Sequence, residues 1–202
     1  MMIPVTRRWW LAASFVAPVL KGLTAPVLKL RLDGSDLRVA APHLKFLTGK
    51  PLERLQDGAA VAFLAQFSLA AGSNGIAMRR AVDRFVVSYD LWEEKFSITR
   101  TGQNRNDRRT VSHLTMAAAE AWCLGNLALN AQGLAPEREF WVRLELRAED
   151  PRDQAAVVGE PGINLTRLIE VFSNPARAQQ ARWEAEEGPV RLADLPHVSG
   201  SG

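Results

Sequence analysis

The sequence predicts a mainly β protein: an antiparallel β-sandwich of immunoglobulin-like size, with one central helix packed on it and short helices near the carboxyl end. Three observations support this α+β class. Apolar residues recur mostly at a period of two, turn residues separate the strand-like runs, and the one convincing long helical pattern is confined to 115–130. The size and turn spacing are typical of a sandwich of about seven strands.

The predicted strands begin with a hairpin and a long apolar run. Apolar residues alternate with charged ones over 28–32 and 37–39, and an Asp-Gly turn pair lies between the two runs. A short helical turn is predicted over 51–56, because a proline is tolerated at a first helical position. Residues 59–69 include few polar side chains, so we expect a strand that is buried on both faces.

Two further strands and a basic loop are predicted next. The runs 81–89 and 96–100 are rich in β-branched and aromatic residues, and the short connection between them favours antiparallel pairing. Loop 102–109 is typical of a solvated loop tip, with weak contact to a phosphate or lipid headgroup as the alternative. Its arginines are Arg105, Arg108 and Arg109.

The central helix is predicted over 115–130. Thr115 can cap it, and apolar residues then recur at helical spacing along one face. Over 140–147, apolar residues at every second position alternate with Trp141 and three charged residues, which predicts a half-exposed strand. Two short helices are expected after a polar connection, over 165–172 and 176–187.

The domain organisation follows from these patterns. We expect an export segment over 1–25, a single β-rich domain over 26–195 and a disordered tail over 196–202. A body of about 175 residues has the usual size of one domain and can bury well over half of its unfolded surface.

The amino-terminal segment has the parts of a signal peptide in the right order. Such a signal has a positive start, an apolar run of about 7–15 residues and small residues before the cleavage site. Arg7 and Arg8 precede the apolar run 9–20, and Ala25 ends an acceptable cleavage site. The sequence therefore predicts export to the periplasm or cell envelope.

This segment has several alternative interpretations. If it is not cleaved, it would anchor the protein to the membrane, although a spanning helix needs about 20 mainly apolar residues and Lys21 interrupts this run. The paired arginines resemble an incomplete twin-arginine signal. A misplaced start codon or a buried first helix would remove the export prediction altogether.

The net charge belongs to this segment. The chain has 25 Lys and Arg residues and 22 Asp and Glu residues; Arg7, Arg8 and Lys21 lie in the first 25 residues, so 22 basic residues remain beside 22 acidic ones. We therefore expect no nucleic-acid partner. The single cysteine, Cys123, excludes an internal disulfide and the cysteine-based zinc frameworks.

No catalytic or metal-binding motif stands out. The histidines His43, His113 and His197 are far apart, and none has a neighbouring ligand at a metal-binding spacing, so we predict no metal and no cofactor. They are interpreted as a strand residue, a residue just before the helix cap and a tail residue. Cys123 is interpreted as a small buried helix residue rather than a nucleophile paired with His113. The acidic group Asp90, Glu93 and Glu94 is more typical of a solvated turn than of paired catalytic carboxylates.

The candidate interaction surface is centred on an aromatic residue. Of the tryptophans Trp92, Trp122, Trp141 and Trp183, Trp122 is assigned to the core, whereas Trp141 lies on the charged face of its predicted strand. The predicted surface comprises Trp141, Arg143, Arg105, Arg108 and Arg109.

A family resemblance supports the envelope location. The run Arg-Phe-Val-Val-Ser-Tyr-Asp at 84–90, Phe96, a single helix, a strand, and the segments 168–172 and 188–195 follow in an order that resembles the uncharacterised bacterial family called domain of unknown function 4390. The resemblance spans nearly the whole chain. It implies an amino-terminal export signal and no assigned activity.

The leading functional hypothesis is a non-enzymatic envelope protein that binds another protein through a sheet face or edge. The first alternative is a carrier of a lipid or other apolar ligand. It would need a closed apolar cavity between sheet and helix with a volume of several hundred Å³, within the range of about 300–1,000 Å³ for ligand sites. The second alternative is a hydrolase with an unfamiliar site, which would require His113, Asp90 or Glu94 to converge in one cleft.

Overall fold

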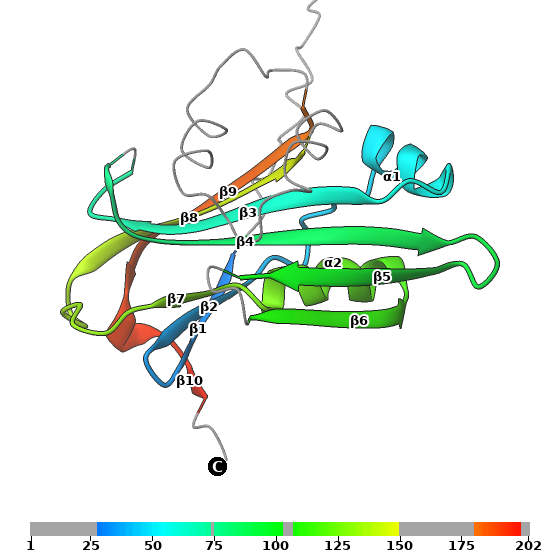
Figure 1. The fold of residues 1–202 in the computed structure, drawn as a ribbon. Coiled ribbons are helices and arrows are strands. Elements are labelled where there is room, and N and C mark those ends of the chain that lie inside the picture. Colours follow the sequence, from blue (N-terminus) through cyan, green and yellow to red (C-terminus); the bar gives the residue numbers. More distant parts are fainter. Residues whose placement is uncertain (1–27, 74, 103–106, 150–179, 199–202) are drawn as a thin grey trace, which may run out of the picture.

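The computed structural model describes residues 28–73, 75–102, 107–149 and 180–198, and these form two packed β-sheets (Figure 1). The larger sheet consists of β3 (Val61–Ala70), β4 (Ala77–Asp90), β5 (Lys95–Thr101), β6 (Arg108–Leu114), β8 (Glu139–Ala148) and β9 (Arg182–Arg191), in the order β6-β5-β4-β3-β8-β9. All its neighbouring strands are antiparallel. The predicted antiparallel β-sandwich is confirmed.

The smaller sheet has the order β10-β1-β2-β7 and consists of β1 (Lys29–Asp33), β2 (Asp36–Ala40), β7 (Ala128–Asn130) and β10 (His197–Val198). The predicted hairpin is its centre: β1 and β2 pair with Leu32 opposite Leu37. Gly34 makes the turn with φ +60°, a backbone conformation that favours glycine. The described residues therefore contain ten strands, three more than the sequence predicts.

In the described residues, two α-helices and a short 3-10 helix, η2 (Leu192–Asp194), accompany the sheets. α1 (Gly49–Gln56) confirms the predicted helical turn, and α2 (Met116–Gly125) is the predicted central helix, which contacts β2 and β5. Thr115 caps α2, as expected, by accepting a hydrogen bond from the Ala118 amide at 3.3 Å. The helix ends five residues earlier than predicted, at Gly125, where the Asn126 side chain donates to the Trp122 carbonyl at 2.7 Å. The chain then enters the core and β7.

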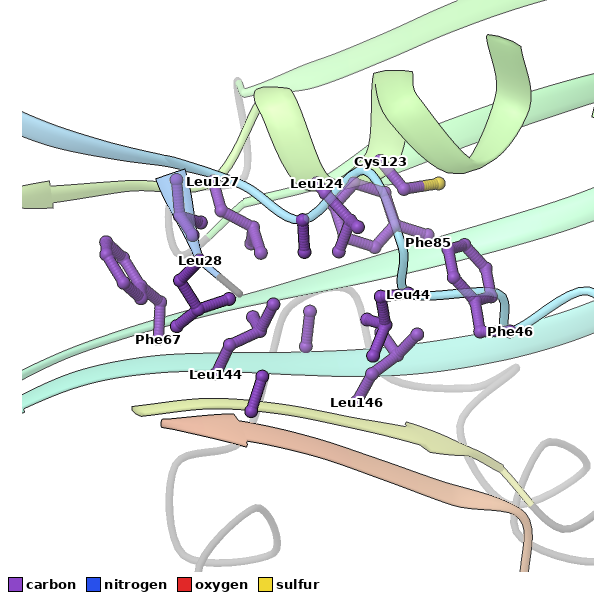
Figure 2. Packing of buried hydrophobic residues seen from close by; sticks show 14 of the residues in the cluster. Leu28, Leu44, Phe46, Phe67, Phe85, Cys123, Leu124, Leu127, Leu144 and Leu146 are labelled. Carbon is purple, nitrogen blue, oxygen red and sulfur yellow. The ribbon is translucent and has the colours of Figure 1, made fainter. Parts of the chain in front are cut away.

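The core fills the space between the two sheets and α2. Side chains from the inner faces of both layers meet there, and Figure 2 shows Phe67 and Leu144 of the larger sheet on one side facing Leu28, Leu124 and Leu127 on the other. Each fully buried side chain of this size contributes about 1.5–3 kcal/mol. One continuous apolar cluster therefore joins the two layers.

β3 is the central strand of the larger sheet and confirms the prediction of burial on both faces. It pairs with β4 on one side and β8 on the other. Phe63 and Phe67 enter the core, whereas Leu64, Gln66 and Ser68 alternate with them and are also buried. We call the side of the sheet with Gln66 and Ser68 the outer face.

The carboxyl-terminal predictions need correction. The helix predicted over 176–187 is wrong where the structure describes it, because residues 182–187 belong to β9. Its alanines and charged residues have high helix propensity, but pairing with β8 overrides that preference and places Trp183 opposite Leu146. Residues 176–179 and the helix predicted over 165–172 lie outside the described residues.

Three other predictions are wrong in part. The tail is not disordered throughout, since His197 and Val198 pair with β1 as β10; residues 199–202 are not described. The second half of β8 is buried rather than half-exposed, with Glu145 and Arg147 at 6% and 7% exposure, because β3 and β9 flank it. Arg108 begins a strand instead of ending a loop.

The predicted export segment 1–25 also lies outside the described residues and stays a prediction.

Candidate functional site

The four described residues of the predicted interaction surface do not come together. Trp141 and Arg143 lie on β8, whereas Arg108 and Arg109 lie on β6, an edge strand that β5, β4 and β3 separate from β8. Arg105 lies outside the described residues. The prediction therefore corresponds to two surfaces on different parts of the larger sheet.

Trp141 and Arg143 line a groove of about 310 Å³ on the outer face. Trp141 is half-buried and packs over Gly188, where an added Cβ atom would lie 2.9 Å from two of the Trp141 ring atoms. The Arg143 guanidinium binds the Glu186 carboxylate at 2.6 and 2.8 Å. The groove is completed by Gln66, Ser68, Arg80, Glu145 and, at its exposed end, Ile76.

The second basic surface is the edge strand β6. Arg108 and Arg109 are exposed there, and Arg109 approaches the Asp107 carboxylate at 3.8 Å. Asp107 also reaches inward, at 3.4 Å from Arg100, and its carboxylate closely approaches the Gly102 backbone. Part of the predicted solvated loop is thus tied to the sheet interior.

Arg100 belongs to an ionic cluster inside a cleft of about 540 Å³ between the sheets. It binds Asp83 through two hydrogen bonds of 3.1 and 3.3 Å. Burial raises the pKa of Asp83, and the Arg100 guanidinium opposes this rise. Arg79 and Gln132 also line the cleft. Sequence reasoning missed this cluster, because Asp83 and Arg100 fall at ordinary positions in two β runs.

The residues considered for a hydrolase meet at an exposed turn and not in a cleft. His113 Nε2 lies 3.1 Å from Glu93 Oε2, with their side chains 73% and 54% exposed. Asp90 accepts hydrogen bonds from the amides of Trp92 and Glu93 at 2.8 and 3.0 Å. The amides of Glu93 and Trp92 lower the pKa of the Asp90 carboxyl, because they stabilise its charged form. These groups fasten the turn between β4 and β5.

The same turn presents the most exposed aromatic residue of the described chain. Trp92 is 97% exposed and its neighbour Leu91 is 56% exposed. The turn lies at the tip of the long β4–β5 hairpin, beyond the end of the sheet (Figure 1). The predicted interaction surface does not include Trp92, although the sequence has an apolar Leu-Trp pair within an acidic turn between two strands. We call Leu91 and Trp92 the hairpin tip.

The remaining candidates have structural roles. His43 lies in a turn, not in the predicted strand. Cys123 is fully buried in α2, and burial, reinforced by the nearby Glu120 carboxylate, raises the pKa of its thiol. Trp122 packs edge-on against Phe85 with ring centroids 6.3 Å apart, which confirms its assignment to the core. No group of three metal-ligating side chains occurs among the residues that the structure describes.

A smaller cleft bears on the carrier alternative. It has a volume of about 190 Å³, and Ala40, Pro42 and Leu44 line it together with Lys45 and Glu120. It lies beside α2, and the core residues Leu44 and Leu124 form part of its wall.

Glu120, which lines this cleft, is held by contacts on both of its carboxylate oxygens. One carboxylate oxygen accepts the backbone amides of Phe46 and Leu47 at 2.8 and 3.1 Å, and the other binds the Lys45 ammonium at 3.1 Å. These three contacts link α2 to the segment leading to α1, and we call Glu120 the strap residue.

Comparisons with known proteins find no match for this chain among family models, curated proteins or solved structures. In the part of the chain that the structure describes, no helix is both long enough and apolar enough to cross a membrane.

Proposed function

We propose that this protein is a non-enzymatic interaction module of the bacterial cell envelope, which binds a partner protein through the hairpin tip. The observation that supports the proposal best is the 97% exposure of Trp92. Tryptophan contributes most to protein interfaces when it fills a pocket on the partner. Exposure of this residue to water has a cost that such a contact would remove.

The turn holds the backbone of Trp92 in a fixed position. Two backbone amides bind the Asp90 carboxylate, and His113 on β6 binds Glu93 from the side. A preorganised anchor loses less conformational entropy on binding than a flexible one does. The geometry of the turn is therefore suited to docking.

The charge of the turn indicates the kind of partner. Asp90, Glu93 and Glu94 surround the hairpin tip, and Lys95 is the only Lys or Arg residue of the turn. An acidic surface is repelled by anionic lipids, which disfavours insertion into the inner envelope membrane as the role of Trp92. The fitting partner is a protein with an apolar pocket and a basic rim.

A cross-linking experiment in cells tests this proposal. A photo-reactive phenylalanine analogue replaces Trp92 in one variant and Ser35, in the exposed β1–β2 turn, in the matched control. We expect one discrete protein adduct from position 92 and none from position 35. Reversing the charge of Glu93 and Glu94 to lysine should abolish that adduct. Equal adducts from both positions, or none from position 92, would show that the hairpin tip is not the binding surface.

The envelope location has a separate test. Residues 1–40 are fused to a reporter enzyme that is active only outside the cytoplasm, and an Arg7→Glu, Arg8→Glu fusion is the control. We expect activity from the first fusion and a large loss from the second. A silent first fusion would remove the export part of the proposal and leave the docking part standing.

A further inference from the structure

The groove on the outer face has one polar group whose hydrogen bonding the sheet does not satisfy. Gln66 is 8% exposed, and its Oε1 atom has no hydrogen-bond partner. Its cross-strand neighbours are Val82 on β4 and Glu145 on β8. Neither has a hydrogen to donate, since one is apolar and an ionised carboxylate only accepts.

The next polar residue along β3 does not fill this need either. The Ser68 hydroxyl is directed to the Arg143 carbonyl at 3.5 Å. A buried polar atom without a partner costs about 1–3 kcal/mol, so such atoms are rare unless a ligand or water completes them. The floor of the groove therefore has unused hydrogen-bonding capacity.

The charges of the groove balance. Two arginines, Arg80 and Arg143, line it together with two glutamates, Glu145 and Glu186. Balanced charge gives no preference for an anion or a cation. The same side chains offer many hydrogen-bond donors and acceptors next to one another, which suits groups that both donate and accept.

Trp141 adds a flat apolar surface to these polar groups. One side of its ring is packed against Gly188, and its side chain lines the groove together with Ile76, which is 93% exposed. A sugar ring combines an apolar C–H face with a rim of hydroxyl groups. The volume of about 310 Å³ is at the lower end of the range of about 300–1,000 Å³ for small-molecule sites.

We propose that this groove is a binding site for a neutral saccharide, which packs a ring face on Trp141 and places hydroxyl groups against Gln66 and the Arg143–Glu186 pair. The site is on the outer face of the larger sheet, whereas the hairpin tip is at the end of the β4–β5 hairpin. The two surfaces share no residue, so either can function without the other.

The test follows the indole N–H resonance of Trp141 in the full chain. Maltose, cellobiose and the N-acetylglucosamine disaccharide are the neutral probes, and glucuronic acid and inorganic phosphate are the charged ones. We expect a saturable shift with at least one neutral disaccharide and weaker binding of both charged probes. Gln66→Leu should raise the dissociation constant by about tenfold, the effect of one lost hydrogen bond.

Two controls separate binding from folding. Gln66→Leu has a similar shape and removes an unsatisfied buried group, so it should fold at least as stably as the wild type while it binds sugar less well. Trp92→Ala should bind the saccharide unchanged, which keeps this site independent of the proposed docking surface. The proposal is overturned if no neutral probe gives a saturable shift, if a charged probe binds more tightly than every neutral one, or if Gln66→Leu binds sugar as the wild type does.

Discussion

At the scale of single residues, the strap residue Glu120 places a carboxyl group inside the protein. Its side chain is 4% exposed, and its two carboxylate oxygens bind residues 45–47. Those three contacts tie α2 to the connection that leads into α1. Because buried amides without an acceptor are costly, this carboxylate stabilises the position of both Phe46 and Leu47.

Substitutions of Glu120 should separate its two roles. Glu120→Ala leaves two buried amides without an acceptor, so we expect a loss of about 3 kcal/mol in the free energy of unfolding. Glu120→Gln keeps an oxygen for the amides and loses only the contact with the half-exposed Lys45, so its loss should be about 1 kcal/mol or less. Urea unfolding of both variants measures the difference. Equal losses would mean that the amide contacts do not contribute.

The Asp83–Arg100 pair predicts a pH dependence. Both side chains are largely buried, at 7% and 12% exposure, so Arg100→Met leaves an uncompensated carboxylate and should cost about 3 kcal/mol at neutral pH. Removing the guanidinium raises the pKa of Asp83 further above its ordinary 3.8, because only burial then acts strongly on it. When folding raises the pKa of a carboxyl group, the resulting stability is fully present at a pH below the pKa of the unfolded state. It is lost as the pH rises through the pKa of the folded state.

The deficit of Arg100→Met should therefore shrink as the pH falls toward 3.8. Unfolding measured across this range, with Asp83→Leu, Arg100→Met as the control, checks the sign. The double variant has no buried charge at this position and should recover most of the lost stability at neutral pH. A deficit that is independent of pH, or that grows in acid, would contradict this account.

At the scale of elements, β8 and β9 pack closely against each other where Gly188 of β9 meets Trp141 of β8. Gly188 lies against the Trp141 ring, and an added Cβ atom would also lie 3.1 Å from the Phe140 carbonyl. Gly188→Ala should therefore destabilise the protein by about 1–3 kcal/mol and shift the Trp141 indole resonance. Gly125→Ala is the control, since its Cβ would meet nothing within 4 Å. If both variants unfold alike, the contact does not constrain β9.

The local sequence pattern is enough to predict some of the elements. These are the β1–β2 hairpin, β3, the β4–β5 pair and the start of α2. Alternation, a long apolar run and a Thr cap each indicate one type of local structure. β9 was missed because Arg, Glu and Ala favour a helix locally, and only β8 supplies the partners that make it a strand. β6 was missed because its arginines are typical of a solvated loop in the sequence, and only the pairing with β5 makes this segment a strand.

The candidate sites were harder to predict from the sequence than the fold. Trp141 and Arg143 were predicted as contacts from one strand's alternation, and the structure places both in one groove. Gln66, which completes that groove, lies within an apolar run, and its missing partner depends on Val82 and Glu145 from two other strands. Sequence spacing within one strand does not contain that information.

At the scale of the whole molecule, one continuous core joins the layers. Cys123 lies within it, fully buried in the helix that contacts both β2 of the smaller sheet and β5 of the larger one. Burial also raises the pKa of its thiol, so little reactive thiolate is present at neutral pH. Exposure of this thiol requires α2 to leave both sheets.

Cys123 should therefore report opening of the whole sandwich. We expect a thiol reagent to label the native protein very slowly, and labelling to accelerate along the same denaturant curve as the loss of β-sheet circular dichroism. Glu120→Ala should accelerate labelling in proportion to its loss of stability, because the strap on α2 is then released. If Cys123 reacts rapidly while the sheet signal is intact, α2 opens separately, and the two layers and the helix do not form one cooperative unit.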